Sequence, residues 1–123
     1  GQEINLMRFY PSTKRTAAVR GAVDDRIRNI SKQFGQEYFD GDRRYGYGGY
    51  YYHPRFWTET VRLFYDHYKL PEDASILDIG CAKGFMLFDF MQLMPGATLR
   101  GVDVSQYAIE NCKEEVESFL QLG

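Results

Sequence analysis

The sequence predicts an α/β fold built on a parallel sheet, and three of its features carry that prediction. Two short aliphatic stretches, 75–79 and 98–103, each end in an aspartate and are typical of buried strands. The stretch between them, 85–94, is apolar along almost its whole length and predicts a helix. A strand, a helix and a second strand in this order form a right-handed crossover, which places the two strands side by side and parallel.

The N-terminal extension is expected to be partly irregular and partly helical. Residues 1–23 hold few apolar residues in any period, so we expect an irregular arm with a helical piece from Thr16. A helix is then expected to begin at Asp24 and to end at Gly35. Its apolar face is predicted by the spacing of three side chains, those of Ile27, Ile30 and Phe34.

The stretch 36–53 is unusual because it holds six of the ten tyrosines together with four glycines. Glycine gives backbone freedom, and tyrosine gives a flat amphipathic surface with a hydroxyl group. Three interpretations stay open: an aromatic loop packed on the core, a lid over a ligand, or a platform for single-stranded nucleic acid beside Arg43 and Arg44. We rank the last of these lowest because the surrounding charge is acidic.

Helices are predicted on both sides of the central strands. Pro54 is well placed in a first helical turn, and an amphipathic stripe follows it at Trp57, Val61, Phe64 and Tyr68. Ser105 is a good helix cap, and an apolar helical face is expected from there to the C-terminus. We therefore expect two parts, an arm, helix and lid over 1–53 and an α/β part over 54–123.

Composition excludes several classes of protein. The net charge of −2 over 123 residues gives no sign of binding to nucleic acid or to an anionic membrane. The sequence has no apolar run of the ~18 residues that a membrane span needs. Two cysteines, Cys81 and Cys112, form neither a disulfide framework nor a metal site, so we expect no bound metal and a reducing, cytoplasmic setting.

A ligand site is predicted where the two strands end. Gly80 and Gly84 bracket a tight turn between the first strand and a helix, where free backbone N–H groups face a ligand. Asp78 ends that strand, and Asp103 ends the next one, 19 residues after Gly84. An acid at about this distance past the glycines is placed to accept hydrogen bonds from ribose hydroxyls.

The turn disfavours a phosphate-bearing ligand. A dinucleotide fingerprint would need glycines where Ala82 and Phe85 stand, and a phosphate-binding loop would need a serine or threonine after Lys83. We expect Lys83 to be a solvated loop charge and Cys81 to be a small packed residue. A ribose-bearing ligand without phosphates fits the pattern better, and a nicotinamide enzyme ranks below it.

One stretch resembles the first motif of the class I S-adenosylmethionine-dependent methyltransferases: Leu77-Asp78-Ile79-Gly80-Cys81-Ala82-Lys83-Gly84. Ala82 stands where the motif has its middle glycine. The stretch 101–109 resembles the second-strand motif of that family, and the resemblance covers about residues 70–120. It implies a Rossmann-like, doubly wound fold with S-adenosylmethionine as cofactor. It also implies a cofactor site formed by Asp78, Gly80, Cys81, Gly84, Asp103 and Val104, capped by Tyr47, Gly48 and Tyr50.

The family's sheet continues beyond two strands, so the resemblance predicts an incomplete fold that holds only the first two strands and their flanking helices. We expect a methyltransferase, or its cofactor-binding fragment, that acts on a small-molecule acceptor; no residue stands out as the catalytic base. The alternative is a non-catalytic, truncated domain that serves in oligomerisation or partner binding. A homodimer that completes the sheet is one such assembly, because an open sheet edge invites pairing.

Overall fold

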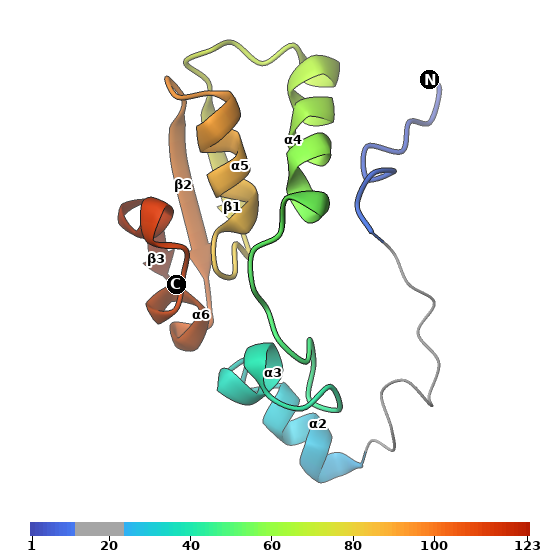
Figure 1. Cartoon of the computed structure of the whole chain (residues 1–123), viewed down its shortest axis with the longest axis vertical. Coiled ribbons are helices and arrows are strands. Elements are labelled where there is room, and N and C mark those ends of the chain that lie inside the picture. Colours follow the sequence, from blue (N-terminus) through green and yellow to red (C-terminus); the bar gives the residue numbers. More distant parts are fainter. Residues whose placement is uncertain (12–23) are drawn as a thin grey trace.

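A computed structural model describes residues 1–11 and 24–123 and has an α/β architecture (Figure 1). Its sheet has three parallel strands in the order β1-β2-β3: β1 (Ser75–Ile79), β2 (Thr98–Asp103) and β3 (Leu120–Leu122). The predicted incomplete, Rossmann-like parallel sheet with an N-terminal extension is confirmed. The helical piece expected from Thr16 lies outside the described residues.

The β1 and β2 strands have the predicted bounds and are joined by α5 (Phe85–Leu93). They pair in parallel from Ser75 opposite Thr98 to Ile79 opposite Val102. This register brings the carboxyl ends of both strands to the same edge of the sheet. Open parallel sheets bind their ligands at that edge.

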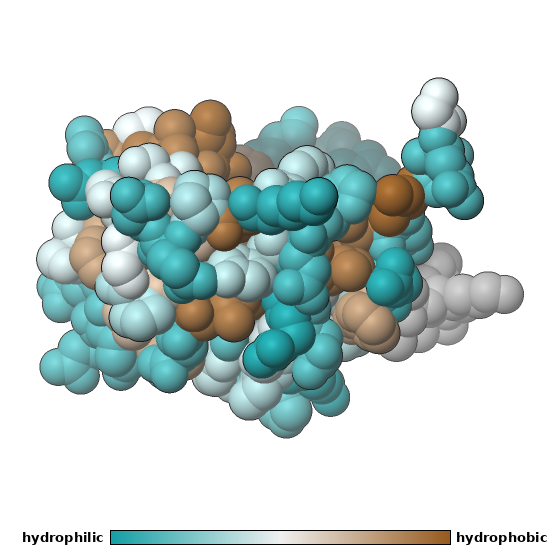
Figure 2. All heavy atoms as spheres, turned by 90° about the horizontal axis from the view of Figure 1, so that it is seen from above, coloured by the Kyte–Doolittle hydropathy of each residue, from teal (hydrophilic) through white to brown (hydrophobic). Residues whose placement is uncertain are grey.

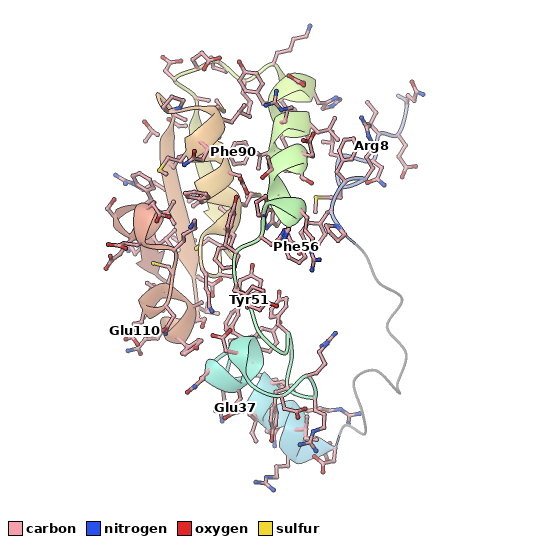
Figure 3. All side chains as sticks on the ribbon, viewed as in Figure 1. Arg8, Glu37, Tyr51, Phe56, Phe90 and Glu110 are labelled. Atoms are coloured by element: carbon pink, nitrogen blue, oxygen red, sulfur yellow. The ribbon has the colours of Figure 1, made fainter. Side chains whose placement is uncertain are left out.

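One face of the sheet is covered by α5 and by α4 (Pro54–Tyr68), which lie side by side in Figure 1. The core between them is apolar, and its buried members include Val61, Leu87, Met94 and Leu99. Phe90 points from α5 toward α4 in Figure 3, where its ring stacks 6.4 Å from that of Phe64. The apolar stripe of α4 and the almost continuous apolar run of α5 therefore bury this face of the sheet.

The opposite face of β1 remains open. Leu77 is 60% exposed and Ile79 is 78% exposed, although both are strand residues with large aliphatic side chains. Seen from above, hydrophobic side chains reach the surface at several places among hydrophilic ones (Figure 2). Parallel sheets normally bury both faces, so this half-covered sheet agrees with the prediction of an incomplete fold.

The helical segment that precedes the lid lies beneath the carboxyl edge of the sheet, whereas residues 1–11 lie beside α4 (Figure 1). The helical segment contains α2 (Asp25–Ser31) and α3 (Gln36–Asp40), and the first helix is shorter than predicted. The α2 helix starts as expected, with the Asp24 carboxylate accepting from the backbone N–H of Ile27 at 2.9 Å. It stops before Gly35 because Phe34 takes a left-handed conformation (φ 50°) and its carbonyl accepts from the Ser105 hydroxyl.

The C-terminal segment differs from the prediction. The expected helix ends early as α6 (Gln106–Glu110), a short 3₁₀ helix follows at Glu114–Phe119, and the chain then forms β3. The backbone N–H of Lys113 donates to the carbonyl of Lys83 at 2.9 Å, so the segment after α6 contacts the glycine turn. The prediction of only two strands was therefore wrong, because the apolar spacing that suggested a helix also fits a 3₁₀ turn and a strand.

Candidate functional site

The glycine turn 80–84 leaves β1 in a conformation that few residue types tolerate. Gly80, Ala82 and Gly84 all have positive φ angles, of 83°, 50° and 81°. The backbone N–H groups of Gly80 and Cys81 both donate to the carbonyl of Val102, at 2.8 and 3.1 Å. Two backbone hydrogen bonds therefore join the turn to β2, in addition to any side-chain contacts.

The two glycines of the turn serve different purposes. A Cβ atom at Gly80 would meet nothing within 4 Å, so this residue borders open space. A Cβ atom at Gly84 would lie 2.6 Å from a methyl group of Val116. Gly84 is therefore required by packing, and only Gly80 leaves its free side to a ligand.

The Asp103 carboxylate joins the end of β2 to the glycine turn. One of its oxygens accepts from the backbone N–H of Ala82 at 2.7 Å, and the other accepts from that of Ser105 at 2.8 Å. A carboxylate has about four lone-pair sites, so both oxygens retain capacity for further donors. Asp103 can thus organise the turn and accept hydroxyl groups of a ligand at the same time.

The Asp78 carboxyl group is half-buried beside this junction. No donor hydrogen-bonds to it among residues 1–11 and 24–123. Burial, with a smaller contribution from the negative charge of Asp103, raises the pKa of Asp78 to about 6. A carboxylate that is held in place without a partner is well suited to receive a cationic group of a ligand.

The Cys81 side chain points away from this open region. It is buried in the core, where its Cβ lies 2.9 Å from the position that a Cβ on Gly101 would take. Burial and the nearby acids raise the pKa of its thiol to about 12, so it stays protonated. The expectation that Cys81 is a small packed residue is met, and its thiol does not line the open side of the turn.

The Tyr/Gly segment folds back on α3 through backbone contacts. We call residues 47–51 the lid. The N–H groups of Tyr47 and Gly49 donate to the carbonyls of Tyr38 and Phe39, both at 2.9 Å. Gly48 has a φ of 71°, and a Cβ there would press on the Arg43 side chain at 3.0 Å. The glycines of the lid therefore allow the tight path that brings its tyrosines together.

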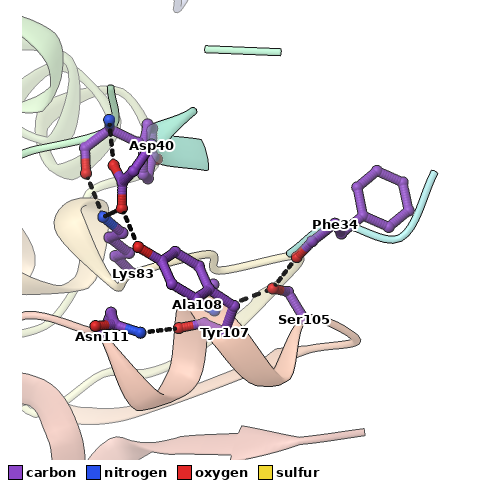
Figure 4. A network of polar contacts seen from close by, with 8 residues as sticks. Phe34, Asp40, Lys83, Ser105, Tyr107, Ala108 and Asn111 are labelled. Carbon is purple, nitrogen blue, oxygen red and sulfur yellow. Dashed lines mark hydrogen bonds and ion pairs between the residues drawn. The ribbon is translucent and has the colours of Figure 1, made fainter. Parts of the chain in front are cut away.

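Lys83 fastens the lid to the glycine turn. Its side chain is only 9% exposed, and its ammonium group donates to the Asp40 carboxylate at 2.8 Å and to the carbonyl of Tyr50 at 2.6 Å. The Tyr107 hydroxyl also donates to Asp40 (Figure 4). Burial alone would raise the pKa of Asp40, but the bonds from Lys83 and Tyr107 outweigh it and lower that pKa.

The sequence prediction for Lys83 was therefore wrong. A lysine in a glycine turn has no visible partner in the sequence, because Asp40 lies 43 residues away and Tyr50 lies 33 residues away. The signal that could have found this contact is Asp40, since the other aspartate of the Tyr/Gly segment, Asp42, has arginines next to it in the sequence.

Two cavities flank the lid. The strand-end cavity, of about 240 Å³, is lined by Phe34, Tyr38, Phe39, Tyr47, Gly80, Ala82, Asp103 and Val104. The lid cavity, of about 260 Å³, is lined by Tyr10, residues 47–51, His53, Arg55, Phe56, Trp57 and Phe85. The Tyr47 side chain borders both, so the two cavities are neighbours.

The structure brings most of the predicted site residues together. Gly80, Asp103 and Val104 line the strand-end cavity, and Tyr47, Gly48 and Tyr50 line the lid cavity. Asp78 lies close enough to raise the pKa of Tyr50, after the larger effects of burial and of the tyrosines near it. Cys81 and Gly84 belong to the same turn, but neither of them, nor Asp78, lines the strand-end cavity or the lid cavity.

Within residues 1–11 and 24–123, no cluster of three histidine, cysteine or acidic side chains could hold a metal ion. In the same part of the chain, no helix is both long enough and apolar enough to cross a membrane.

A parallel sheet with a glycine turn after its first strand and an acid at the end of the second is an arrangement typical of α/β domains that bind ligands at the carboxyl ends of their strands. Residues 70–120 match the family model described as a methyltransferase domain. This part of the chain is therefore similar to a methyltransferase domain, in agreement with the resemblance found in the sequence.

A solved structure titled "Crystal structure of MccD protein" is similar to the chain at 21% sequence identity, with a TM-score of 0.43. The similarity covers 50% of this chain and 29% of that protein, so the chain spans less than a third of its length. No curated protein matches the chain.

Proposed function

We propose that the chain binds S-adenosylmethionine at the carboxyl ends of β1 and β2 and takes part in methyl transfer to a small-molecule acceptor. The observation that carries this proposal is the half-buried Asp78 carboxyl group, which has no hydrogen-bond donor among the described residues and lies next to the free side of Gly80. The similarity of residues 70–120 to a methyltransferase domain supports the choice of cofactor.

The groups at this edge fit the parts of that cofactor. Its ammonium group is a cation that Asp78 can accept, and its ribose offers hydroxyl donors to Asp103. The strand-end cavity has aromatic walls from Tyr38 and Phe39 and an exposed Val104, which together offer flat apolar surface to an adenine ring. No phosphate needs a partner, in keeping with the absence of a phosphate-binding pattern in the turn.

S-adenosylmethionine, when bound, supplies a methyl group on a positively charged sulfur, which is already activated for transfer. The chain's own contribution is then to hold and orient the reactants and to exclude water. Tyr50 is suited to orientation rather than to base catalysis, since burial raises its pKa and keeps its hydroxyl protonated. Its hydroxyl can donate a hydrogen bond to a ligand.

Isothermal titration calorimetry with S-adenosylmethionine and its demethylated product tests the proposal. We expect both to bind, and we expect Asp103→Asn and Asp78→Asn each to weaken binding at least tenfold. The control is Asp73→Asn, in the exposed turn before β1. No binding by the unmodified chain, or unchanged binding in both site variants with an intact fold by circular dichroism, would refute the proposal.

A second candidate is a non-catalytic domain that assembles with a copy of itself, and the exposed Leu77 and Ile79 on the open sheet face favour it. Sedimentation velocity distinguishes the two: a dimer that Ile79→Lys dissociates, without methyl transfer, supports assembly. A monomer that methylates any acceptor excludes it. For both candidates we propose a reducing, cytoplasmic setting, because Cys81 and Cys112 are free thiols.

A further inference from the structure

We propose that the lid cavity is the methyl-acceptor site and that it takes a small planar aromatic molecule carrying a carboxylate. This inference rests on the proposed function, because it assigns the second substrate of the same site. Three features carry it: the position of the cavity, the nature of its walls and its charge.

The lid cavity lies where an acceptor has to lie. It shares the Tyr47 side chain with the strand-end cavity, and Phe85 in its wall is the first residue of α5, directly after the glycine turn. The rings of Tyr50 and Phe85 stack with centroids 4.8 Å apart. A molecule in the lid cavity is therefore close to the turn, with Tyr47 between it and the strand-end cavity.

The walls of the lid cavity are flat and aromatic. They come from three separate segments of the chain: Tyr10 in the N-terminal arm, the lid tyrosines, and Phe56 and Trp57 at the start of α4. Figure 3 shows Phe56 at the base of α4, on the side of the arm, and Tyr51 between α3 and α4. The Tyr10 ring lies 4.9 Å from Trp57 and 5.7 Å from Phe56, a spacing that aromatic pairs favour.

The size of the lid cavity limits the ligand. Its volume of about 260 Å³ is below the roughly 300–1,000 Å³ of sites for drug-sized ligands. One or two rings with a short substituent fit such a space, whereas a peptide or a nucleic-acid strand does not. The ligand class is therefore a small aromatic molecule.

The charge of the lid cavity is positive. Arg55 lines it, and no aspartate or glutamate does so among the described residues. Arg55 makes no ion pair within residues 1–11 and 24–123, and its guanidinium lies over the Phe56 ring, 4.8 Å from the centroid. A guanidinium is a planar fork that matches a carboxylate with two hydrogen bonds, so an unpaired one beside aromatic walls favours an aromatic anion.

Three probes that share one ring and differ in charge test the assignment: benzoate, benzamide and benzylamine. Saturation-transfer NMR measures their binding with and without the demethylated cofactor. Trp57 is the chain's single tryptophan and lies in the cavity wall, so its fluorescence reports occupancy. We expect benzoate to bind about tenfold more tightly than benzamide, and benzylamine to bind least.

Two variants locate the effect. Arg55→Gln should remove the preference for benzoate over benzamide, while Arg62→Gln, on the exposed side of the same helix, should preserve it. Tyr51→Ser removes a ring that is 75% exposed, so the fold should persist while all three probes bind more weakly. Equal binding of the three probes, a preference for benzylamine, or an unchanged preference in Arg55→Gln would overturn the inference.

The same experiment separates this inference from the proposed function. If benzoate binds with the expected preference and the cofactor product does not bind, the proposed function fails while the aromatic anion site stands. If the cofactor product binds and benzoate does not, the cofactor site stands and the acceptor assignment fails.

Discussion

The glycine turn and the lid are both glycine-rich and both border the candidate site, yet they are held in different ways. The turn is fixed by backbone bonds from Gly80 and Cys81 to the adjoining strand. The lid is held to α3 by backbone bonds, but it is joined to the turn by the Lys83 side chain, whose partners lie 33 and 43 residues away in the sequence. The comparison teaches that the turn is set by pairing with the adjoining strand, whereas the contact between the lid and the turn depends on a buried cation and on the stacked rings of Tyr50 and Phe85.

Among the variants considered, replacement of Lys83 should have the largest effect on stability, because it removes the side chain that joins the lid to the turn. Lys83→Met leaves the partly buried Asp40 carboxylate without its cation and frees the carbonyl of Tyr50, so we expect a loss of about 3 kcal/mol in the free energy of unfolding. Urea denaturation measures the loss, and limited proteolysis should show faster cleavage in 36–51. The control Arg44→Met removes an exposed pair with Asp42 and should cost less than about 1 kcal/mol. Equal effects of the two variants would contradict a lid fastened by Lys83.

The two glycines of the turn offer a matched pair for the next test, since their φ angles are nearly equal. Gly84→Ala adds a clash with Val116 to the backbone strain, and we expect about 2–3 kcal/mol of lost stability. Gly80→Ala faces open space and should cost only the strain, about 1 kcal/mol, while it weakens cofactor binding more. Thermal melts and calorimetry measure both quantities. A reversed order of stabilities would show that the packing explanation for Gly84 is wrong.

The ionised Asp78 carboxyl group should lower the stability of the free chain while it favours binding of the cofactor. Its pKa of about 6 in the folded chain lies above the ordinary value of 3.8, so its favourable contribution is present below pH 3.8 and is lost as the pH rises through 6. Asp78→Asn should therefore stabilise the free chain at pH 7 by about 1 kcal/mol, after allowance for solvent screening. Melting curves from pH 4 to 8 check this.

Cofactor affinity should change in the opposite sense. Because a cation prefers the ionised carboxylate, binding by the unmodified chain should tighten as the pH rises through 6. The Asp78→Asn variant should lose this pH dependence along with much of the affinity. A variant that keeps the slope would assign the titration to another group.

Ala82→Gly should have the smallest effect. Ala82 has a φ of 50°, so glycine would relieve about 1 kcal/mol of backbone strain in the folded chain. Glycine would also raise the conformational entropy of the unfolded chain, which lowers stability by a similar free energy. We expect a net change below about 0.5 kcal/mol by urea denaturation. A large gain would show that the turn stores more strain than its backbone angles indicate.

Much of the fold could be predicted because its signals are local. The bounds of β1 and β2 follow from aliphatic runs that end at an acid or before a glycine, α5 follows from an apolar run between Gly84 and Pro95, and α4 follows from Pro54 and an apolar period. The C-terminal strand could not be predicted, because Leu120–Leu122 has a strand conformation only by pairing with β2. Short apolar runs are compatible with both helix and strand until a neighbour decides between them.

The residues of the candidate site also fall into two groups: those that local sequence signals predict and those that depend on tertiary contacts. Asp78, Gly80 and Asp103 could be placed from the sequence, because strand ends in a parallel sheet converge at one edge. The roles of Lys83, Asp40 and Arg55 could not, since each depends on a partner or a cavity formed by distant segments. The functional difference between Gly80 and Gly84 was equally invisible, because the sequence does not show that Val116 packs against only one of them.

By itself, the sequence determined the order of β1, the glycine turn, α5 and β2, and with it the edge at which a cofactor is expected. These features depend on backbone conformation and on apolar periods of a few residues, which the local sequence encodes. Only the tertiary structure decided that Lys83 is buried, that the lid closes on the turn and that a positively charged aromatic cavity lies beside it. Such features depend on contacts between residues that lie tens of positions apart in the sequence. Only folding brings the charge, ring or methyl group of one segment next to its partner in another.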